Sequence, residues 1–246
     1  MLGGISGEQL AQIVKSNLGA SPIPRAFDQG VRDRAVRIAA AQGLPQRIES
    51  ELADEDPVRI ISYSDYRRFR RSGNRSYCDG LMNQRDRQAD LAASAVYIGM
   101  ADKAPFLQDL LWVGCESSWW ELPSHENPPA PIDLRAATRA FNYALVGTML
   151  CNELGGEVAD RMLLEARRRV LDEYLNPDRY YWWWKHTNNW NAVCNGGIGL
   201  AAMLIEPDAD RLTAILQRVL QGLGSFLSGF TPDGGCTEGA GYWRYG

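Results

Sequence analysis

Apolar positions repeat at helical spacing over most of the chain beyond residue 85. Residues 85–102, 157–175 and 212–227 each carry an apolar stripe at intervals of three and four positions, which predicts amphipathic helices. Residues 133–150 and 191–205 are apolar on most sides, as expected for helices packed between other helices. The pattern therefore predicts an all-α protein.

The breaks between these stretches indicate helices joined by short turns. Proline residues precede residue 133, a glycine pair separates the helices at 155–156, and further prolines follow residues 176 and 206. Asp133 is placed to cap the helix that follows it. Val58 to Ile61 is the one stretch that resembles a strand. Helix pairs in series predict a bundle or a ring of antiparallel helix hairpins.

We expect residues 1–246 to form one domain, with residues 1–80 as its N-terminal helical part. The chain ends on the aromatic segment 242–246, directly after a glycine-rich loop. From this ending we expect a chain truncated before further protein.

Composition limits the function classes. Apolar residues make up 45% and charged residues 23%, with a net charge of −4, so the composition is that of a globular protein with no nucleic-acid footprint. The basic run at 66–71 is expected to be a solvated helix face. No stretch approaches the ~20 apolar residues of a membrane helix, and no signal peptide is visible. Five widely spaced cysteines favour a reducing compartment, so we expect a cytoplasmic protein, with the periplasm as the alternative if the N-terminus is truncated.

Three segments carry the candidate chemistry. The first, residues 119–125, places His125 beside two tryptophans, where it either binds substrate or simply packs on a loop. The second, residues 180–191, has five consecutive aromatic residues, which cannot all be buried on one face. Its remaining candidates are Trp184, His186, Trp190, Asn188, Asn189 and Asn191.

One of these asparagines is expected to be a helix N-cap. The others, if buried, need partners that a ligand would supply. The third segment, residues 230–245, is a glycine-rich loop that contains Glu238, Tyr242, Arg244 and Tyr245.

Other chemistry is not favoured. Residues 197–202 match a dinucleotide-binding motif, but no strand precedes them. With two histidines and no ligand cluster, we expect no metal and no cofactor.

The second and third segments together are similar to the heparinase II/III-like polysaccharide lyases, a group that includes alginate and oligoalginate lyases. The resemblance lies in residues 188–197 (NNWNAVCNGG), residues 232–235 (PDGG) and residues 238–246 (EGAGYWRYG). It covers residues 85–246. It implies an incomplete (α/α) toroid that a C-terminal β-sandwich normally follows, with the acidic poly- or oligosaccharide bound between the two parts.

The activity implied is β-elimination at a uronic acid. By the same resemblance, Asn188 or Asn189 neutralises the substrate carboxylate, and Tyr242, or alternatively Tyr245, is the catalytic tyrosine. Substrate binding falls to the remaining candidates, namely His125, Trp184, His186, Trp190, Asn191, Glu238 and Arg244. Family lyases also take a histidine from the β-sandwich, so this chain by itself is expected to lack part of the site.

Two alternatives remain open. A glycoside hydrolase on a similar toroid would need two carboxylates, such as Glu238 with Asp233 or Glu121. A non-catalytic domain would instead stack sugar rings on its aromatic residues without turning them over.

Overall fold

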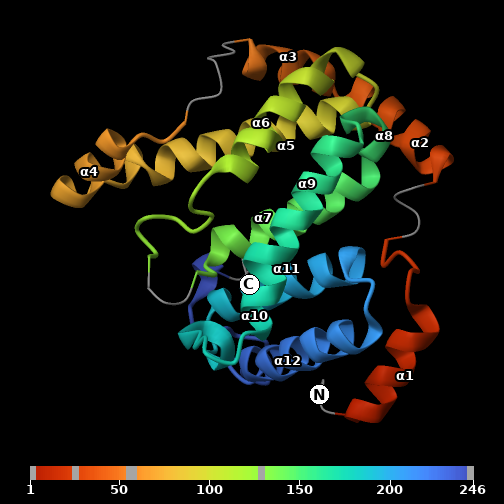
Figure 1. The fold of residues 1–246 in the computed structure, drawn as a ribbon, viewed down its shortest axis with the longest axis vertical. Coiled ribbons are helices and arrows are strands. Elements are labelled where there is room, and N and C mark those ends of the chain that lie inside the picture. The colour runs from red at the N-terminus through yellow and green to blue at the C-terminus, as the bar shows by residue number, and fades with distance from the viewer. Residues whose placement is uncertain (1–3, 24–27, 54–59, 127–130, 243–246) are drawn as a thin grey trace. The chain divides into compact units, whose positions relative to one another are not determined.

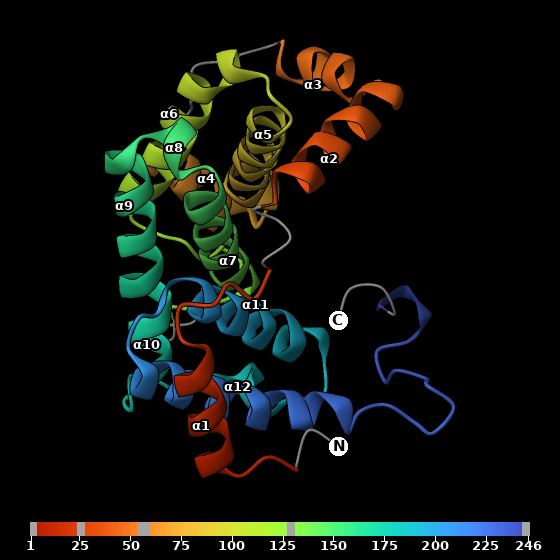
Figure 2. The same cartoon turned by 90° about the vertical axis from the view of Figure 1, so that its right-hand side faces the viewer.

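The computed structural model describes residues 4–23, 28–53, 60–126 and 131–242, and these form helices joined by turns and loops (Figures 1 and 2). The described residues contain no strand, only an isolated bridge between Phe230 and Cys236. The predicted all-α class is confirmed. The helices are α1 (Gly7–Asn17), α2 (Gln29–Ala41), α3 (Leu44–Leu52), α4 (Tyr63–Ser72), α5 (Asp79–Tyr97), α6 (Ala104–Glu116), α7 (Leu134–Met149), α8 (Cys151–Leu154), α9 (Gly156–Ala166), α10 (Asp172–Leu175), α11 (Asn189–Ile205) and α12 (Ala209–Leu227).

The chain divides into two compact units. One consists of Met1–Pro22, His125–Leu145 and Leu164–Gly246, and the other of Ile23–Ser124 and Val146–Leu163. We call them the α11–α12 unit and the α5–α6 unit after their central helices.

In the α5–α6 unit, α5 packs against α6 and α3, while α2 packs on α3 and α8 on α6. Small residues of α5, including Ala92 and Ala95, are fully buried, which lets its neighbours approach closely. The basic run lies on α4, where its arginines are exposed and only Phe69 between them is buried. The expected solvated helix face is confirmed.

In the α11–α12 unit, α11 and α12 lie side by side, and α1 packs against α12 (Figure 2). Close approach requires glycine at Gly222 of α12, because a Cβ atom there would lie 2.8 Å from the carbonyl oxygen of Trp184. Trp184 belongs to a 3₁₀ turn, η5 (Trp182–Lys185), which contacts both α11 and α12. The start of α11 is therefore held against α12.

The predicted helix boundaries differ from the observed ones in instructive ways. The helix expected over 157–175 is α9 followed by a π-helical turn, η4 (Arg167–Leu171), and α10. Gly155, at a φ of 75°, separates α8 from α9 as predicted. The helix expected over 85–102 begins earlier, at Asp79, and ends at Tyr97, because Gly99 adopts a φ of 100°. The expected strand is not formed at Ile60 and Ile61, and its first two residues lie outside the described part.

Candidate functional site

The N-terminus of α11 is held by a carboxylate from a distant loop. Asn188 occupies the N-cap position, but its side chain caps no backbone N–H group. Glu238 does so instead: the Asn189 backbone N–H donates to its Oε2 at 2.5 Å, and Asn189 Nδ2 donates to its Oε1 at 3.1 Å. Unpaired N–H groups and the helix dipole make such an end a favourable place for a carboxylate. The start of α11 is thus capped by a carboxylate of the protein itself, that of Glu238.

Two amide oxygens at the same helix end are buried and unmatched. The Oδ1 atoms of Asn188 and Asn189 are both inaccessible to solvent and accept no hydrogen bond within the described structure. Asn189 is only 5% exposed. Since its Nδ2 must face the Glu238 carboxylate, the orientation of its amide is fixed and Oδ1 is the atom left over. An unsatisfied buried acceptor costs about 1–3 kcal/mol, so each of these oxygens would gain stability from a hydrogen-bond donor.

Asn191 is used entirely within the protein. Its side chain is fully buried, and Nδ2 lies within hydrogen-bonding distance of three backbone oxygens, those of Trp184 at 2.9 Å, His186 at 2.7 Å and Gly222 at 2.8 Å. Its Oδ1 accepts from Asn195. This residue therefore fixes the turn before α11 and presents no atom to a ligand.

Four aromatic rings form a continuous series. One comes from the loop before α7 and three come from the segment 182–190. The His125 ring lies 4.8 Å from the Trp190 ring, Trp190 lies 5.0 Å from Trp182, and Trp182 lies 5.7 Å from His186, measured between centroids. Trp182 is 38% exposed. We call these four residues the ring series. It brings together His125, His186 and Trp190 of the candidates, and it adds Trp182.

His125 is oriented by a buried carboxylate. Its Nδ1 lies 2.9 Å from Oδ2 of Asp133, which is 2% exposed. The other oxygen of Asp133 accepts from the Ala136 backbone N–H at 2.7 Å, so the predicted cap of α7 is confirmed. A carboxylate at Nδ1 selects the tautomer of an imidazole and fixes the orientation of its ring. Sequence reasoning found Asp133 only as a cap, because nothing in the pattern shows that a histidine eight positions earlier turns back to it.

Trp184 lies between cationic side chains. Lys185 Nζ and Arg218 Cζ are each 4.7 Å from its ring centroid, and Trp184 Nε1 donates to the Arg218 carbonyl oxygen at 3.0 Å. Neither cation makes an ion pair in the part of the chain that the structure describes. Arg218 was not among the candidates, because on an amphipathic helix it looks like any other arginine.

The glycine-rich loop is held by its own turn. The Thr231 backbone N–H donates to the Gly235 carbonyl oxygen at 3.0 Å, and Gly234 adopts a φ of 83°. Tyr242 lies in a final 3₁₀ turn, η6 (Ala240–Tyr242), and is 47% exposed. Arg244 and Tyr245 lie outside the described residues.

A buried cysteine near the site is not suited to nucleophilic chemistry. Cys194 is fully buried, and burial raises the pKa of its thiol well above the ordinary value, with the Asp133 carboxylate adding to the effect. The thiolate is therefore disfavoured.

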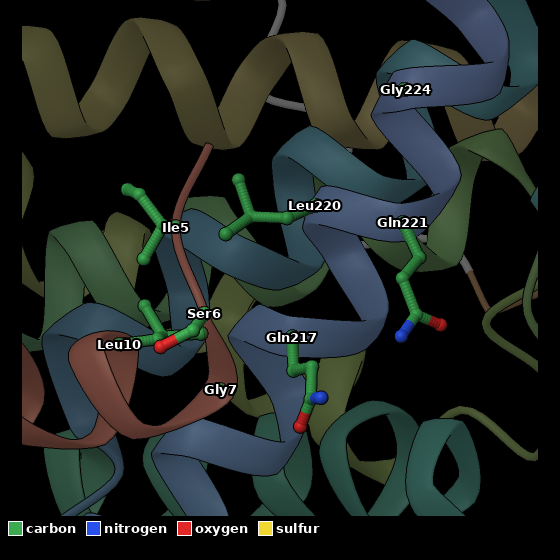
Figure 3. Close-up of a pocket in the computed structure, with 8 residues that line it drawn as sticks. All are labelled: Ile5, Ser6, Gly7, Leu10, Gln217, Leu220, Gln221 and Gly224. Atoms are coloured by element: carbon green, nitrogen blue, oxygen red, sulfur yellow. The ribbon is translucent and has the colours of Figure 1, made fainter. Parts of the chain in front are cut away.

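A separate hollow of about 290 Å³ lies between the N-terminal segment and α12 (Figure 3). Its lining mixes apolar side chains with two amides and comprises Ile5, Ser6, Gly7, Leu10, Gln217, Leu220, Gln221 and Gly224. It contains none of the candidate residues.

Among the described residues, no group of His, Cys, Asp and Glu side chains is arranged to hold a metal ion. Over the same part of the chain, no helix combines the length and the apolar character needed to cross a membrane. No protein-family model matches the sequence, and no curated protein matches it either.

Proposed function

We propose that this protein is a polysaccharide or oligosaccharide lyase that cleaves a uronic-acid-containing glycan by β-elimination, on a helical domain of the (α/α) toroid type. One observation carries the proposal. The α11 N-terminus already binds a carboxylate through Asn189, and beside it two buried amide oxygens, on Asn188 and Asn189, have no partner.

Elimination at a uronic acid needs a neutral donor at the substrate carboxylate. Removing the C5 proton moves negative charge onto that carboxylate, and hydrogen bonds to it stabilise the enolate-like intermediate. The Asn189 amide has a second Nδ2 hydrogen beyond the one given to Glu238. We assign this hydrogen to the uronate, and the two unmatched amide oxygens to sugar hydroxyl groups.

Tyr242 is assigned the proton transfers. Its phenolic oxygen accepts the C5 proton while its own proton passes to the leaving C4 oxygen, and the C5–H electron pair forms the C4–C5 double bond as the C4–O bond breaks. The phenol is regenerated in the same step, so no other reactant is needed. Tyr245 is the alternative.

Aromatic and cationic side chains supply the glycan-binding surface. The ring series offers planar faces for sugar rings. Lys185 and Arg218 beside Trp184 supply positive charge for an acidic chain. We also place the protein in the cytoplasm, which five free thiols support.

A non-catalytic glycan-binding role is the second candidate, because Tyr180, two positions before Trp182, is 78% exposed and suits stacking without chemistry. A hydrolase is less well supported. Glu238 is engaged by Asn189, and Asp233 accepts hydrogen bonds from its own loop at Thr231 and Gly235. Glu121 belongs to the α5–α6 unit.

The masses of the products test the proposal. Elimination gives an unsaturated product lighter by one water than the corresponding hydrolysis product, and Tyr242→Phe should abolish it while leaving glycan binding within about threefold. Products of hydrolytic mass would refute the lyase. Binding without any product, in a chain that retains its fold, would favour the binding domain.

A further inference from the structure

Glu238 joins two parts of the candidate site that are far apart in the sequence. It lies 49 positions beyond Asn189, in the loop that ends at Tyr242, and both of its carboxylate oxygens are used at the start of α11. The resulting contact is bidentate. It connects the loop that carries Tyr242, the assigned base, to helix α11, which carries Asn189, the assigned hydrogen-bond donor to the uronate carboxylate.

The contact restricts the Asn189 side chain. One oxygen of Glu238 binds the backbone N–H of Asn189 and the other binds Nδ2 of the same residue, so the side-chain torsions of Asn189 are fixed relative to its backbone. The second Nδ2 hydrogen and Oδ1 are then presented in one orientation. A catalytic group whose rotamer is fixed by its neighbours needs no reordering when substrate arrives.

The same contact fixes the start of the short segment from Glu238 to Tyr242. The Glu238 backbone N–H donates to Cys236 Sγ at 3.3 Å. Two tight turns follow, in which the Gly239 N–H donates to the Cys236 carbonyl oxygen and the Tyr242 N–H donates to the Gly239 carbonyl oxygen, both at 3.1 Å. Gly239 adopts a φ of 84°, which suits only glycine in such a turn. The position of Glu238 therefore constrains the position of Tyr242, because the residues between them and their neighbours are held by these hydrogen bonds.

We propose that Glu238 is a positioning residue for the elimination: its carboxylate orients the Asn189 amide toward the uronate and holds the Tyr242 loop at the same helix end. This inference rests on the proposed function. The negative charge matters as well as the shape, because both partners are donors and the helix terminus is positive. A glutamine would present an N–H group to one of these donors.

The test compares Glu238→Gln and Glu238→Asp with a control, Asp210→Asn, whose carboxylate is exposed on α12. Steady-state kinetics on an acidic glycan that the wild-type chain cleaves are combined with ¹H–¹⁵N spectra of the Asn189 and Tyr242 backbone amides. For Glu238→Gln we expect kcat to fall about 100-fold, with KM within about threefold. Both amide resonances should shift. Glu238→Asp should recover part of kcat, and the control should behave as wild type.

The outcomes separate the inference from the proposed function. If the wild-type chain eliminates and Glu238→Gln keeps its kcat within about threefold, the positioning role is refuted and the lyase stands. A loss of kcat that merely parallels a lowered unfolding midpoint, with no recovery in Glu238→Asp, refutes it too, because it shows a structural cap. A folded wild-type chain that eliminates no acidic glycan overturns both.

Discussion

Asn188, Asn189 and Asn191 lie within four positions of the sequence, yet their side chains meet different surroundings. Asn191 lies among backbone carbonyl oxygens on η5 and α12, whereas the other two keep an unmatched oxygen at the helix end. Asn189 and Asn191 are both buried, but two positions along the helix turn the side chain of Asn191 toward η5 and α12. At this scale, one amide holds the turn before α11 in place, and each of its two neighbours keeps a buried oxygen without a partner.

Replacing Asn191 with alanine should destabilise the protein strongly. Three backbone carbonyl oxygens and the Asn195 amide would lose a hydrogen-bond partner, and we expect the free energy of unfolding to fall by about 2–4 kcal/mol. Denaturant unfolding followed by circular dichroism measures the change. Asn152→Ala, on an exposed position of α8, is the control and should change stability by less than about 0.5 kcal/mol. Equal effects of the two substitutions would contradict the assignment.

At the scale of helices, the π-helical turn between α9 and α10 carries a charged cluster. Glu165 is 3% exposed and accepts hydrogen bonds from Arg168 and Arg169. Burial raises the pKa of Glu165, but the hydrogen bonds from Arg169 and Arg168 and their charges lower it more, so that its pKa lies below the ordinary value of 4.5. The lowered pKa couples the stability of this element to pH.

Glu165→Gln should therefore destabilise the protein in a pH-dependent way. The stabilisation by the carboxylate is fully present above pH 4.5, the unfolded value, and is lost as pH falls through the lower folded pKa. We expect a loss of about 1.5 kcal/mol at pH 7 that shrinks on acidification below pH 4.5, measured by urea unfolding across pH. Glu157→Gln, on an exposed position, should change stability by no more than about 0.5 kcal/mol at any pH. A loss that is constant with pH would contradict the assigned role.

Two glycines of α12 give a matched test of helix packing. A Cβ at Gly222 would collide with the Asn195 amide and the Trp184 carbonyl, so Gly222→Ala should cost about 1–3 kcal/mol. Gly224 has no atom within 4 Å of an added Cβ, and Gly224→Ala should stabilise the helix by about 0.5–1 kcal/mol. Thermal unfolding of both variants checks the opposite signs, and a shift in the same direction would be inconsistent with this packing.

Over the whole molecule, the net charge of −4 does not favour an acidic ligand, so attraction must come from local cations. Lys185 and Arg218 form no ion pair with a carboxylate in the described part of the chain, whereas Lys15 lies 3.6 Å from Asp210. Acidic-glycan affinity should fall with added salt, and Lys185→Gln should weaken binding about 3–10-fold and flatten that salt dependence. Lys15→Gln is the control. Titration by tryptophan fluorescence at several salt concentrations decides this, and an unchanged salt slope in Lys185→Gln would count against the cationic subsite.

The sequence predicted the helical class, the helix that starts at the asparagine cluster and the cap at Asp133, because periodicity and turn residues act locally. It predicted that residues 1–80 are helical, but not where the four helices α1 to α4 begin and end, because their apolar stripes are short and interrupted by charge. Nor did it predict that Glu238 binds Asn189 or that Asp133 orients His125. Such contacts depend on which loop reaches which helix end, and one sequence pattern holds no information on that. Which separated stretches of the chain pack into each compact unit is not encoded in the local pattern, for the same reason.

The most direct test of the central claim is ultraviolet absorbance of the protein incubated with alginate, heparin, heparan, hyaluronan and pectin fragments. Elimination creates a C4–C5 double bond conjugated with the carboxylate. The account predicts a rise in absorbance on one of these substrates, and a loss of that rise in both Asn189→Ala and Tyr242→Phe. New reducing ends without any rise in absorbance would contradict the account and show that the site hydrolyses its glycan.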